Sequence, residues 1–259
     1  MSQSILVERE GVIATVTLNR PEKRNALDAA GWAALGDAME ALSEDDALRC
    51  VVLRGAGPDA FGAGADISNF KDEHSTPALA KAYKAKTDHA MEAIANGKHP
   101  VIAMIHGYCL GGGFEIATAC DIRIAAESAR LGVPARLMGL YLGYGLLDTL
   151  VNVLGRATAL EIALEGRIYT AREAYEKGMI NHLVPDDKLE EEAYASARRI
   201  AEGAPLAARW HRKAIRRYGD PSPLSEAEIA DSYAYTETED YHEGYRAFLA
   251  KEKPVFKGR

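Results

Sequence analysis

Gly107-Tyr108-Cys109-Leu110-Gly111-Gly112-Gly113-Phe114-Glu115 links a predicted strand, residues 101–105, to a predicted helix. Its three successive glycines let the backbone pass close to a ligand, because no Cβ atom stands in the way. A helix that begins there directs unpaired N–H groups and the positive end of its dipole at whatever lies in front of it. The stretch therefore predicts an anion site, and a developing oxyanion suits it.

A second junction of the same kind lies earlier in the chain. An apolar, strand-like run at residues 50–54 is followed by Phe61-Gly62-Ala63-Gly64-Ala65-Asp66-Ile67. A glycine-rich turn on its own is most often a flexible loop or a point of tight packing. Two such turns, each after a strand, can instead direct two backbone N–H groups toward a single oxygen atom.

Several ordered segments resemble motifs of the enoyl-CoA hydratase/isomerase family, which is also called the crotonase family. The first reads Asn19-Arg20-Pro21-Glu22-Lys23-Arg24-Asn25-Ala26-Leu27-Asp28, and the last ends Lys253-Pro254-Val255-Phe256-Lys257-Gly258-Arg259. Between them lie residues 60–67, 106–121 and 166–185. Because these segments follow one another in the family's order, the resemblance covers nearly the whole chain.

The resemblance implies an α/β fold with a crotonase-like ββα spiral core. This acyl-CoA-binding core is expected over residues 1–187. A helical C-terminal region, residues 188–259, is expected to make the contacts of a homotrimer or of a dimer of trimers. The residues themselves favour a similar division, because strand-like runs at 50–53, 101–105 and 122–125 alternate with helices, whereas the pattern beyond residue 187 is mainly helical.

Local patterns predict several further elements. Residues 5–8 and 12–18 alternate like the strands of a hairpin, and Asp28 is placed to cap a helix that carries Trp32. The polar segment 69–77 is expected to be a mobile loop beside the pocket, ahead of a helix over residues 78–96. Four C-terminal helices are expected, over residues 189–201, 204–217, 224–235 and 239–251.

The composition is that of an ordinary soluble globular protein. The chain has 259 residues, of which 47% are hydrophobic and 27% are charged. It contains no apolar run long enough for a membrane span, and its first residues lack the pattern of a secretion signal, so a cytoplasmic location without membrane contact is expected. A net charge of -7 argues against a nucleic-acid partner.

The three cysteines, Cys50, Cys109 and Cys120, lie in apolar surroundings without metal-ligand spacing. We therefore expect buried, reduced thiols and no metal site. No cofactor is expected either, since coenzyme A would enter as part of the substrate.

The resemblance also implies a site for an acyl-CoA thioester. By their positions in the motifs, the backbone N–H groups of Ala65 and Gly112 would form an oxyanion hole, which stabilises negative charge on the thioester oxygen. Phe256 and Lys257 would lie at the adenine end of coenzyme A. The remaining residues expected along the substrate are Arg24, Ala26, Ala63, Asp66, Ile67, Gly111, Ala135 and Tyr141.

Glu115 is the candidate acid or base. It lies three residues after Gly112, in the first turn of the predicted helix. The helix dipole there favours the ionised carboxylate, whereas apolar neighbours such as Phe114 and Ile116 would raise its pKa by desolvation. The sequence leaves these two opposing effects unresolved.

One position departs from the family pattern. Typical hydratases carry a second catalytic glutamate after a Gly-x-Pro sequence, but this chain reads Leu131-Gly132-Val133-Pro134-Ala135-Arg136. Residues 139–147 are also aromatic and aliphatic where relatives have a Gly-Pro-rich turn. The polar groups that could enter the altered pocket instead are Arg136, Tyr141, Tyr144 and Asp148.

Four functions are consistent with this sequence. Hydration of a 2-enoyl-CoA is favoured, because Glu115 is present. Double-bond isomerisation is the second, although family isomerases generally carry their base where Ala135 stands. The third is decarboxylation or carbon–carbon hydrolysis of an acyl-CoA, and the fourth is binding of acyl-CoA without catalysis.

Overall fold

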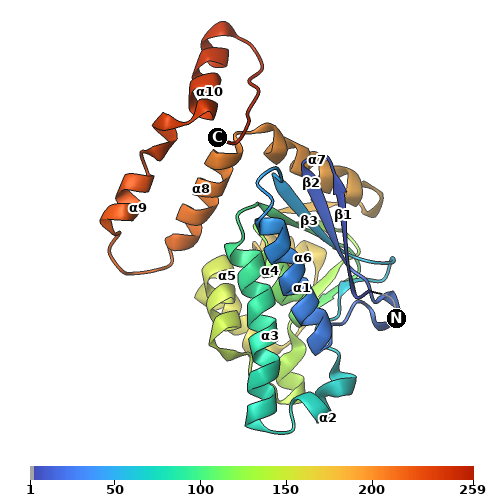
Figure 1. Cartoon of the computed structure of the whole chain (residues 1–259). Coiled ribbons are helices and arrows are strands. Elements are labelled where there is room, and N and C mark those ends of the chain that lie inside the picture. Colours follow the sequence, from blue (N-terminus) through green and yellow to red (C-terminus); the bar gives the residue numbers. More distant parts are fainter. Residues whose placement is uncertain (1–2) are drawn as a thin grey trace.

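A computed structural model describes residues 3–259, and Figure 1 shows its arrangement. Met1 and Ser2 lie outside the described residues. They belong to the N-terminal segment in which the sequence predicts no secretion signal. The larger sheet has six strands in the order β1-β2-β3-β5-β7-β10. The hairpin β1 and β2 is antiparallel and the other neighbours are parallel; the strands are β1 (Ile5–Glu10), β2 (Ile13–Leu18), β3 (Cys50–Gly55), β5 (Val101–Ile105), β7 (Ile122–Ala126) and β10 (His182–Val184).

The central strands of this sheet are buried on both faces. Val51 and Leu53 of β3 join the main hydrophobic core, whereas Cys50 and Val52 join a second cluster on the other face. Parallel strands covered on both sides read as continuous apolar runs, which explains the sequences of β3 and β5. Cys50, like the other two cysteines, is free and buried, as predicted.

A smaller sheet repeats the path of the larger one. Its order is β4-β6-β8-β9, with β4 (Ala60–Gly62), β6 (Tyr108–Leu110), β8 (Arg130–Gly132) and β9 (Ile168–Thr170). β4, β6 and β8 each follow a strand of the larger sheet and precede a helical segment. The chain therefore passes three times through a strand, a second strand and a helix, and the predicted ββα spiral core is confirmed.

Two long helices pack side by side on the main core. α1 (Ala29–Ser43) begins at Asp28, whose side chain accepts a hydrogen bond from the Gly31 N–H at 2.8 Å, so the predicted cap is confirmed. α3 (Pro77–Asn96) lies against α1 (Figure 1). Trp32 of α1 joins the two helices, because its indole Nε1–H donates to the Tyr83 hydroxyl at 2.8 Å.

The segment predicted as a loop at residues 69–77 contains a short helix instead. The 3-10 turn η2 (Ile67–Asn69) leads into α2 (Phe70–Glu73). The Phe70 and His74 rings stack with centroids 4.1 Å apart, and His74 lies 4.5 Å from the ring of Tyr83 on α3. This aromatic contact holds the turn against α3, and polar composition alone did not reveal it.

Three further helices complete the spiral. α4 (Gly112–Ala119) follows the triple-glycine stretch, and α5 (Gly143–Glu165) is interrupted at Gly155, whose backbone is left-handed with φ of 76°. α6 (Ala171–Glu176) begins with a capping box between Thr170 and Glu173. The remaining 3-10 turns are η1 (Pro21–Lys23), η3 (Pro134–Met138) and η4 (Asp186–Lys188).

The C-terminal helices divide into two groups. α7 (Leu189–Glu202) covers the second cluster of the larger sheet with Leu189, Ala193 and Ala197, so core packing extends past residue 187. The following helices extend away from the sheets as an arm (Figure 1). The arm comprises α8 (Pro205–Arg217), α9 (Glu226–Asp231), the turn η5 (Ala234–Glu237) and α10 (Glu239–Ala250).

The helix predicted over residues 224–235 was too long. It divides into α9 and η5, because the Ser232 hydroxyl donates to the Glu228 carbonyl at 3.2 Å while the Ser232 N–H bonds to Ile229 instead. A serine that bonds to the carbonyl four residues earlier weakens the helical pattern there.

Two arginines of α8 anchor the arm to the core. Arg212 donates to the carbonyls of Ile94 and Gly97, at the end of α3, and to the Asp121 carboxylate at 2.7 Å. Arg216 donates to the Ala119 carbonyl, at the end of α4, at 2.7 Å and to Asp121 at 2.8 Å. Cations at helix C-termini interact favourably with the dipole and with the unpaired carbonyls.

Within residues 3–259, none of the helices combines the length and the apolar character needed to cross a membrane.

Candidate active site

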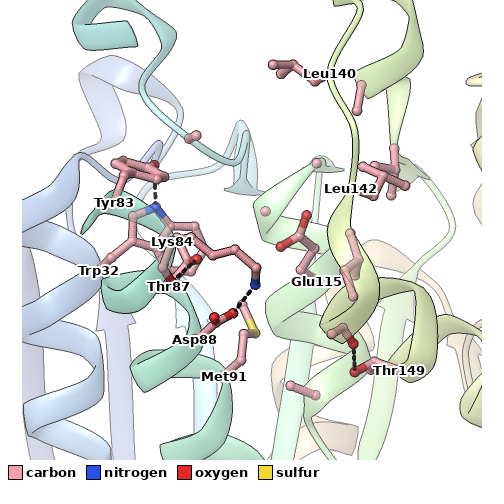
Figure 2. Close-up of a pocket in the computed structure, with 18 of the residues that line it drawn as sticks. Trp32, Tyr83, Lys84, Thr87, Asp88, Met91, Glu115, Leu140, Leu142 and Thr149 are labelled. Carbon is pink, nitrogen blue, oxygen red and sulfur yellow. Dashed lines mark hydrogen bonds and ion pairs between the residues drawn. The ribbon is translucent and has the colours of Figure 1, made fainter. Parts of the chain in front are cut away.

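The candidate site is a cavity of about 660 Å³ between α3, α4 and the start of α5. Figure 2 shows Glu115 projecting into it from α4 and facing side chains of α3. Both glycine-rich junctions reach the cavity, so the two segments that the sequence predicted to converge do so. The predicted site residues that line it are Ala63, Ala65, Ile67, Gly111, Gly112, Glu115, Ala135 and Tyr141.

The backbone amides of Ala65 and Gly112 are available to a ligand. Among the described residues 3–259, neither N–H donates a hydrogen bond to a protein acceptor. Gly112 is the first residue of α4, where an amide has no partner within the helix. Ala65 is held by its two neighbours in the chain. The Gly64 carbonyl accepts from the Leu27 N–H, and the Asp66 N–H donates to the Leu27 carbonyl, so the direction of the Ala65 N–H is fixed.

Glycines bring the two junctions into backbone contact. A Cβ atom on Gly64 would lie 2.7 Å from the Gly112 nitrogen, and one on Gly113 would lie 2.1 Å from the Gly62 carbonyl oxygen. Gly64 also has a left-handed backbone, with φ of +96°. Side chains at these positions would force the two segments apart, so the glycines set the spacing of the amide pair.

Glu115 is half-buried at the cavity wall, and the pKa of its carboxyl group is raised. Desolvation raises the pKa to about 7, the Lys84 ammonium opposes this shift, and the Asp88 carboxylate adds to it. Desolvation is the largest cause of the shift, and the pKa lies above the ordinary value of 4.5. A group with this pKa exchanges protons readily at neutral pH, as an acid or base catalyst must.

Comparison with known proteins agrees with this geometry. The sequence model of the family described as enoyl-CoA hydratase/isomerase matches residues 8–259. The chain belongs to the enoyl-CoA hydratase/isomerase family. A probable enoyl-CoA hydratase of Rhizobium meliloti is 35% identical over 265 residues, which covers 99% of each protein.

Solved structures of this family have the same fold. A crystal structure described as an enoyl-CoA hydratase/carnithine racemase from Magnetospirillum magneticum is 46% identical, with a TM-score of 0.97 over 100% of this chain and 97% of that one. A putative enoyl-CoA hydratase/isomerase family protein from Hyphomonas neptunium is 34% identical, with a TM-score of 0.95 over 100% of this chain and 99% of that one.

The position of the second glutamate in the family pattern lies at the cavity wall. Ala135, in η3, is half-buried there and offers no proton-transfer group. Of the polar residues considered in its place, Arg136 is directed away, because its Nε–H donates to the Glu165 carbonyl at 3.1 Å. Asp148 lines the cavity and accepts a hydrogen bond from Asn152.

The two tyrosines of this segment lie toward the surface. Tyr141 is 71% exposed at the edge of the cavity, and Tyr144 is 85% exposed and does not line it. Their rings meet edge to face with centroids 6.2 Å apart. Neither takes the place of a buried catalytic carboxylate.

Other predicted substrate residues lie outside the cavity lining. The Arg24 guanidinium stacks over the Tyr108 ring, 5.1 Å from its centroid. The Ala26 side chain is buried. The Asp66 carboxylate caps η2 and pairs with Arg20, and hydrogen bonds from Ser68 lower its pKa. The Asp66 N–H donates to the Leu27 carbonyl and the Asp66 carbonyl accepts from the Asn69 N–H, so both main-chain groups have partners within the chain.

Phe256 and Lys257 are placed on the tail that follows α10. The Phe256 carbonyl accepts from Arg49 at 2.5 Å, and the Lys257 N–H donates to Asp240 at 2.6 Å. Neither residue lines the cavity. Their contact with the adenine end of coenzyme A stays a prediction.

One wall of the cavity was missed in the sequence. It consists of side chains of α3, and Trp32 of α1 lies behind it. The spacing of these residues along the predicted helix 78–96 places them on one face, but spacing alone does not show that this face meets the pocket. The α3 residues that line the cavity are Ala80, Tyr83, Lys84, Thr87, Asp88, Met91, Glu92, Ala95 and Asn96.

Asp37, Glu40 and His89 are the group within residues 3–259 whose side-chain atoms come close enough to share a cation. They lie on α1 and α3, outside the cavity lining. His89 directs Nε2 at Asp37 (3.1 Å) and Nδ1 at Glu40 (3.5 Å). Because both ring nitrogens face carboxylates, the geometry is that of an ion-pair cluster, and we assign no metal to it.

Proposed function

We propose that this protein is an enoyl-CoA hydratase, which adds water to the double bond of a 2-enoyl-CoA thioester. One observation supports this above the others: two amides without protein acceptors, Ala65 and Gly112, share a cavity with Glu115, whose pKa is about 7. An oxyanion hole beside a group that moves protons at neutral pH suits chemistry at a thioester enolate.

In the proposed reaction, Glu115 serves as both base and acid. Its carboxylate takes a proton from water as the water oxygen bonds to the β-carbon of the substrate. The electrons of the double bond move toward the thioester carbonyl oxygen, where the Ala65 and Gly112 amides stabilise the negative charge. Glu115 then returns a proton to the α-carbon, which completes the addition of water without a second carboxylate at Ala135.

Coenzyme A would enter only as part of the substrate, and the proposed reaction needs no other cofactor. Lys23 lies 3.9 Å from the Asp66 carboxylate, and the Arg24 carbonyl accepts from the Ala63 N–H, so both cationic residues lie beside the junction at residues 61–67. Phosphates bind to such cationic groups. Cytoplasmic location and the absence of a nucleic-acid partner stay predictions.

A panel of thioesters tests the reaction. The protein would be incubated with a 2-enoyl-CoA, a 3-enoyl-CoA and a β-dicarboxyl-CoA, and the products identified by mass spectrometry. We expect the 2-enoyl-CoA to gain the mass of one water. A 3-enoyl-CoA whose double bond moves at unchanged mass, without hydration of the 2-enoyl-CoA, would contradict the proposal in favour of isomerisation.

Decarboxylation or carbon–carbon hydrolysis is the second candidate. The observation that favours it is Ala135, because these reactions depend on the oxyanion hole and need less proton transfer. Loss of carbon dioxide from the β-dicarboxyl-CoA, with an unchanged 2-enoyl-CoA, would support it over hydration. Binding without turnover of any of the three thioesters would support a non-catalytic role.

We also propose self-association into a trimer or a dimer of trimers. The arm carries apolar side chains that stay exposed among the described residues 3–259, and large exposed apolar surfaces mark interaction sites. Light scattering should give a mass at least three times that of the 28.0 kDa chain. A stable monomer would contradict this. The exposed residues include Ile215, Tyr218, Leu224, Ile229, Phe248 and Leu249.

A further inference from the structure

The wall of the cavity formed by α3 is polar. Tyr83, Lys84, Thr87 and Asp88 lie at positions that share one helix face, and all four line the cavity. Tyr83 and Thr87 already have partners, because the Tyr83 hydroxyl accepts from Trp32 and the Thr87 hydroxyl donates to the Lys84 carbonyl. A hydrocarbon acyl chain would cover the charged groups of Lys84 and Asp88 and offer them no hydrogen bonds. Covering polar groups without new partners costs free energy, so the wall fits an acyl group that is itself polar.

Lys84 and Asp88 are the charged pair of this wall. The Lys84 Nζ lies 2.5 Å from Asp88 Oδ1, and Figure 2 shows the pair facing Glu115 across the cavity. Lys84 extends toward the first turn of α5. Its Nζ lies 4.0 and 3.9 Å from the positions that Cβ atoms on Gly143 and Gly145 would occupy. Because both residues are glycine, no side chain fills the space beside the ammonium group.

The charges around this space select the kind of group that fits. The acidic side chains that line the cavity are Asp88, Glu92, Glu115 and Asp148, and the cationic ones are Lys84 and Arg216. A second carboxylate on the acyl chain would meet repulsion from the acidic groups, and a cationic group would compete with Lys84 for the Asp88 carboxylate. A hydroxyl group is neutral and can donate one hydrogen bond while it accepts another. It therefore matches a neighbouring carboxylate and ammonium group better than either ion does.

We propose that the acyl chain of the substrate carries a hydroxyl group, which donates to the Asp88 carboxylate and accepts from the Lys84 ammonium group. The inference rests on the proposed binding of the thioester at Ala65 and Gly112, because that contact directs the acyl chain past Glu115. The carbon atoms of the chain lie against Met91 and the apolar residues Leu142 and Leu146 on the opposite side.

Binding of matched thioesters tests the substrate class without reliance on turnover. Saturated acyl-CoA thioesters with a hydroxyl group at carbon 4, 5 or 6 would each be compared by calorimetry with the analogue that has a methyl group there. Hydrogen bonds to charged partners contribute about 1.5 to 3 kcal/mol. We therefore expect about 10- to 100-fold tighter binding of the hydroxyl compound at one of the three positions.

Variants of the pair locate the source of the preference. Lys84→Met, and Lys84→Met with Asp88→Leu, should reduce the ratio of the two dissociation constants to about 1. The ratio is measured within each protein, so an effect of Lys84 on the ionisation of Glu115 cancels. Lys86→Met is the matched control, because Lys86 is exposed on the same helix outside the cavity lining and should leave the ratio unchanged.

The outcomes separate this inference from the proposed function. Equal binding of the hydroxyl and methyl compounds at all three positions overturns the inferred substrate class and leaves the acyl-CoA site intact. A preference that survives in both variants also overturns it. If neither thioester binds to the unaltered protein, the proposed function fails and the inference fails with it.

Discussion

The two sides of the cavity are built from different parts of the peptide. On one side, the Ala65 and Gly112 amides are placed by glycines whose backbones touch. On the other side, α3 and residues 134–148 contribute side chains, which can change while the backbone stays in place. The comparison indicates that charge stabilisation is tied to the fold, whereas the choice of acyl group and of proton-transfer groups is tied to side chains.

Glu115→Gln should have the largest effect. The Glu115 side chain projects from α4, directly after the amide pair, and faces the side chains of α3 across the cavity (Figure 2). Loss of a general acid or base lowers turnover by about 10² to 10⁴. The KM should change little, because glutamine has nearly the same shape. Steady-state kinetics on a short 2-enoyl-CoA measures this, with the exposed Glu127→Gln as the control. Full activity of the Glu115→Gln variant would rule out its proposed role.

Gly64→Ala tests the backbone side. The new Cβ would lie 2.7 Å from the Gly112 nitrogen, so the amide pair must shift. Loss of one oxyanion donor lowers kcat by about 10² to 10³. Gly11→Ala is a matched control, because Gly11 also has positive φ (+59°) but no atom within 4 Å of the new Cβ. Equal activity of the two variants would show that spacing of the junctions does not matter.

The pH dependence of stability tests the burial of Glu115. Its pKa of about 7 in the folded protein exceeds the ordinary value of 4.5, so the folded state keeps a proton that the unfolded chain loses between these values. The free energy of unfolding therefore falls as the pH rises through this window. Glu115→Gln removes this fall, and the variant should gain about 3 kcal/mol relative to the unaltered protein between pH 4.5 and pH 8.

Chemical denaturation at both pH values measures this gain. Surface groups titrate equally in the Glu115→Gln variant and in the unaltered protein. The difference between their free energies of unfolding therefore changes with pH only through Glu115. A difference that stays constant with pH would mean that the pKa of the Glu115 carboxyl group is not raised in the folded protein.

Ala135→Glu tests the side-chain wall and should have the smallest effect. It adds a second proton-transfer group at the cavity, and Tyr141 beside it is largely exposed, which leaves space. We expect a rise in kcat for 2-enoyl-CoA hydration of about tenfold or less, because Glu115 already moves protons. Ala135→Gln is the matched control of the same size. If both variants are equally active, the gain does not come from proton transfer.

The backbone side could be predicted from the sequence and the side-chain wall could not. Gly62, Gly64 and residues 111–113 give a strong signal together, since two glycine-rich turns that each follow a strand can direct two amides at one oxygen atom. Lys84 and Asp88 give none, because a helix with many polar residues shows which face is covered only when its neighbours are in place. The same reason hid α2, whose order depends on the contact of Phe70 and His74 with Tyr83.

The C-terminal helices show a similar limit. Their positions were predicted to within a few residues, except where Ser232 divides the helix expected over 224–235. Their separate roles were not, because α7 and the arm have similar amphipathic patterns. Only the packing of Leu189 and Ala193 on the larger sheet distinguishes the first helix from the others.

The arginine anchor of α8 has a consequence for the order in which the chain can fold during synthesis. The carbonyls of Ile94 and Ala119 accept from Arg212 and Arg216 only when these residues have been made, and Asp121, which also accepts from the Val101 N–H, gains its two arginine partners at the same point. The larger sheet is likewise incomplete until β10 has been made, and its second cluster is uncovered until α7 has been made. A nascent chain that ends before residue 216 therefore exposes apolar strands and unpaired polar groups, which is the condition in which chaperones bind and aggregation begins.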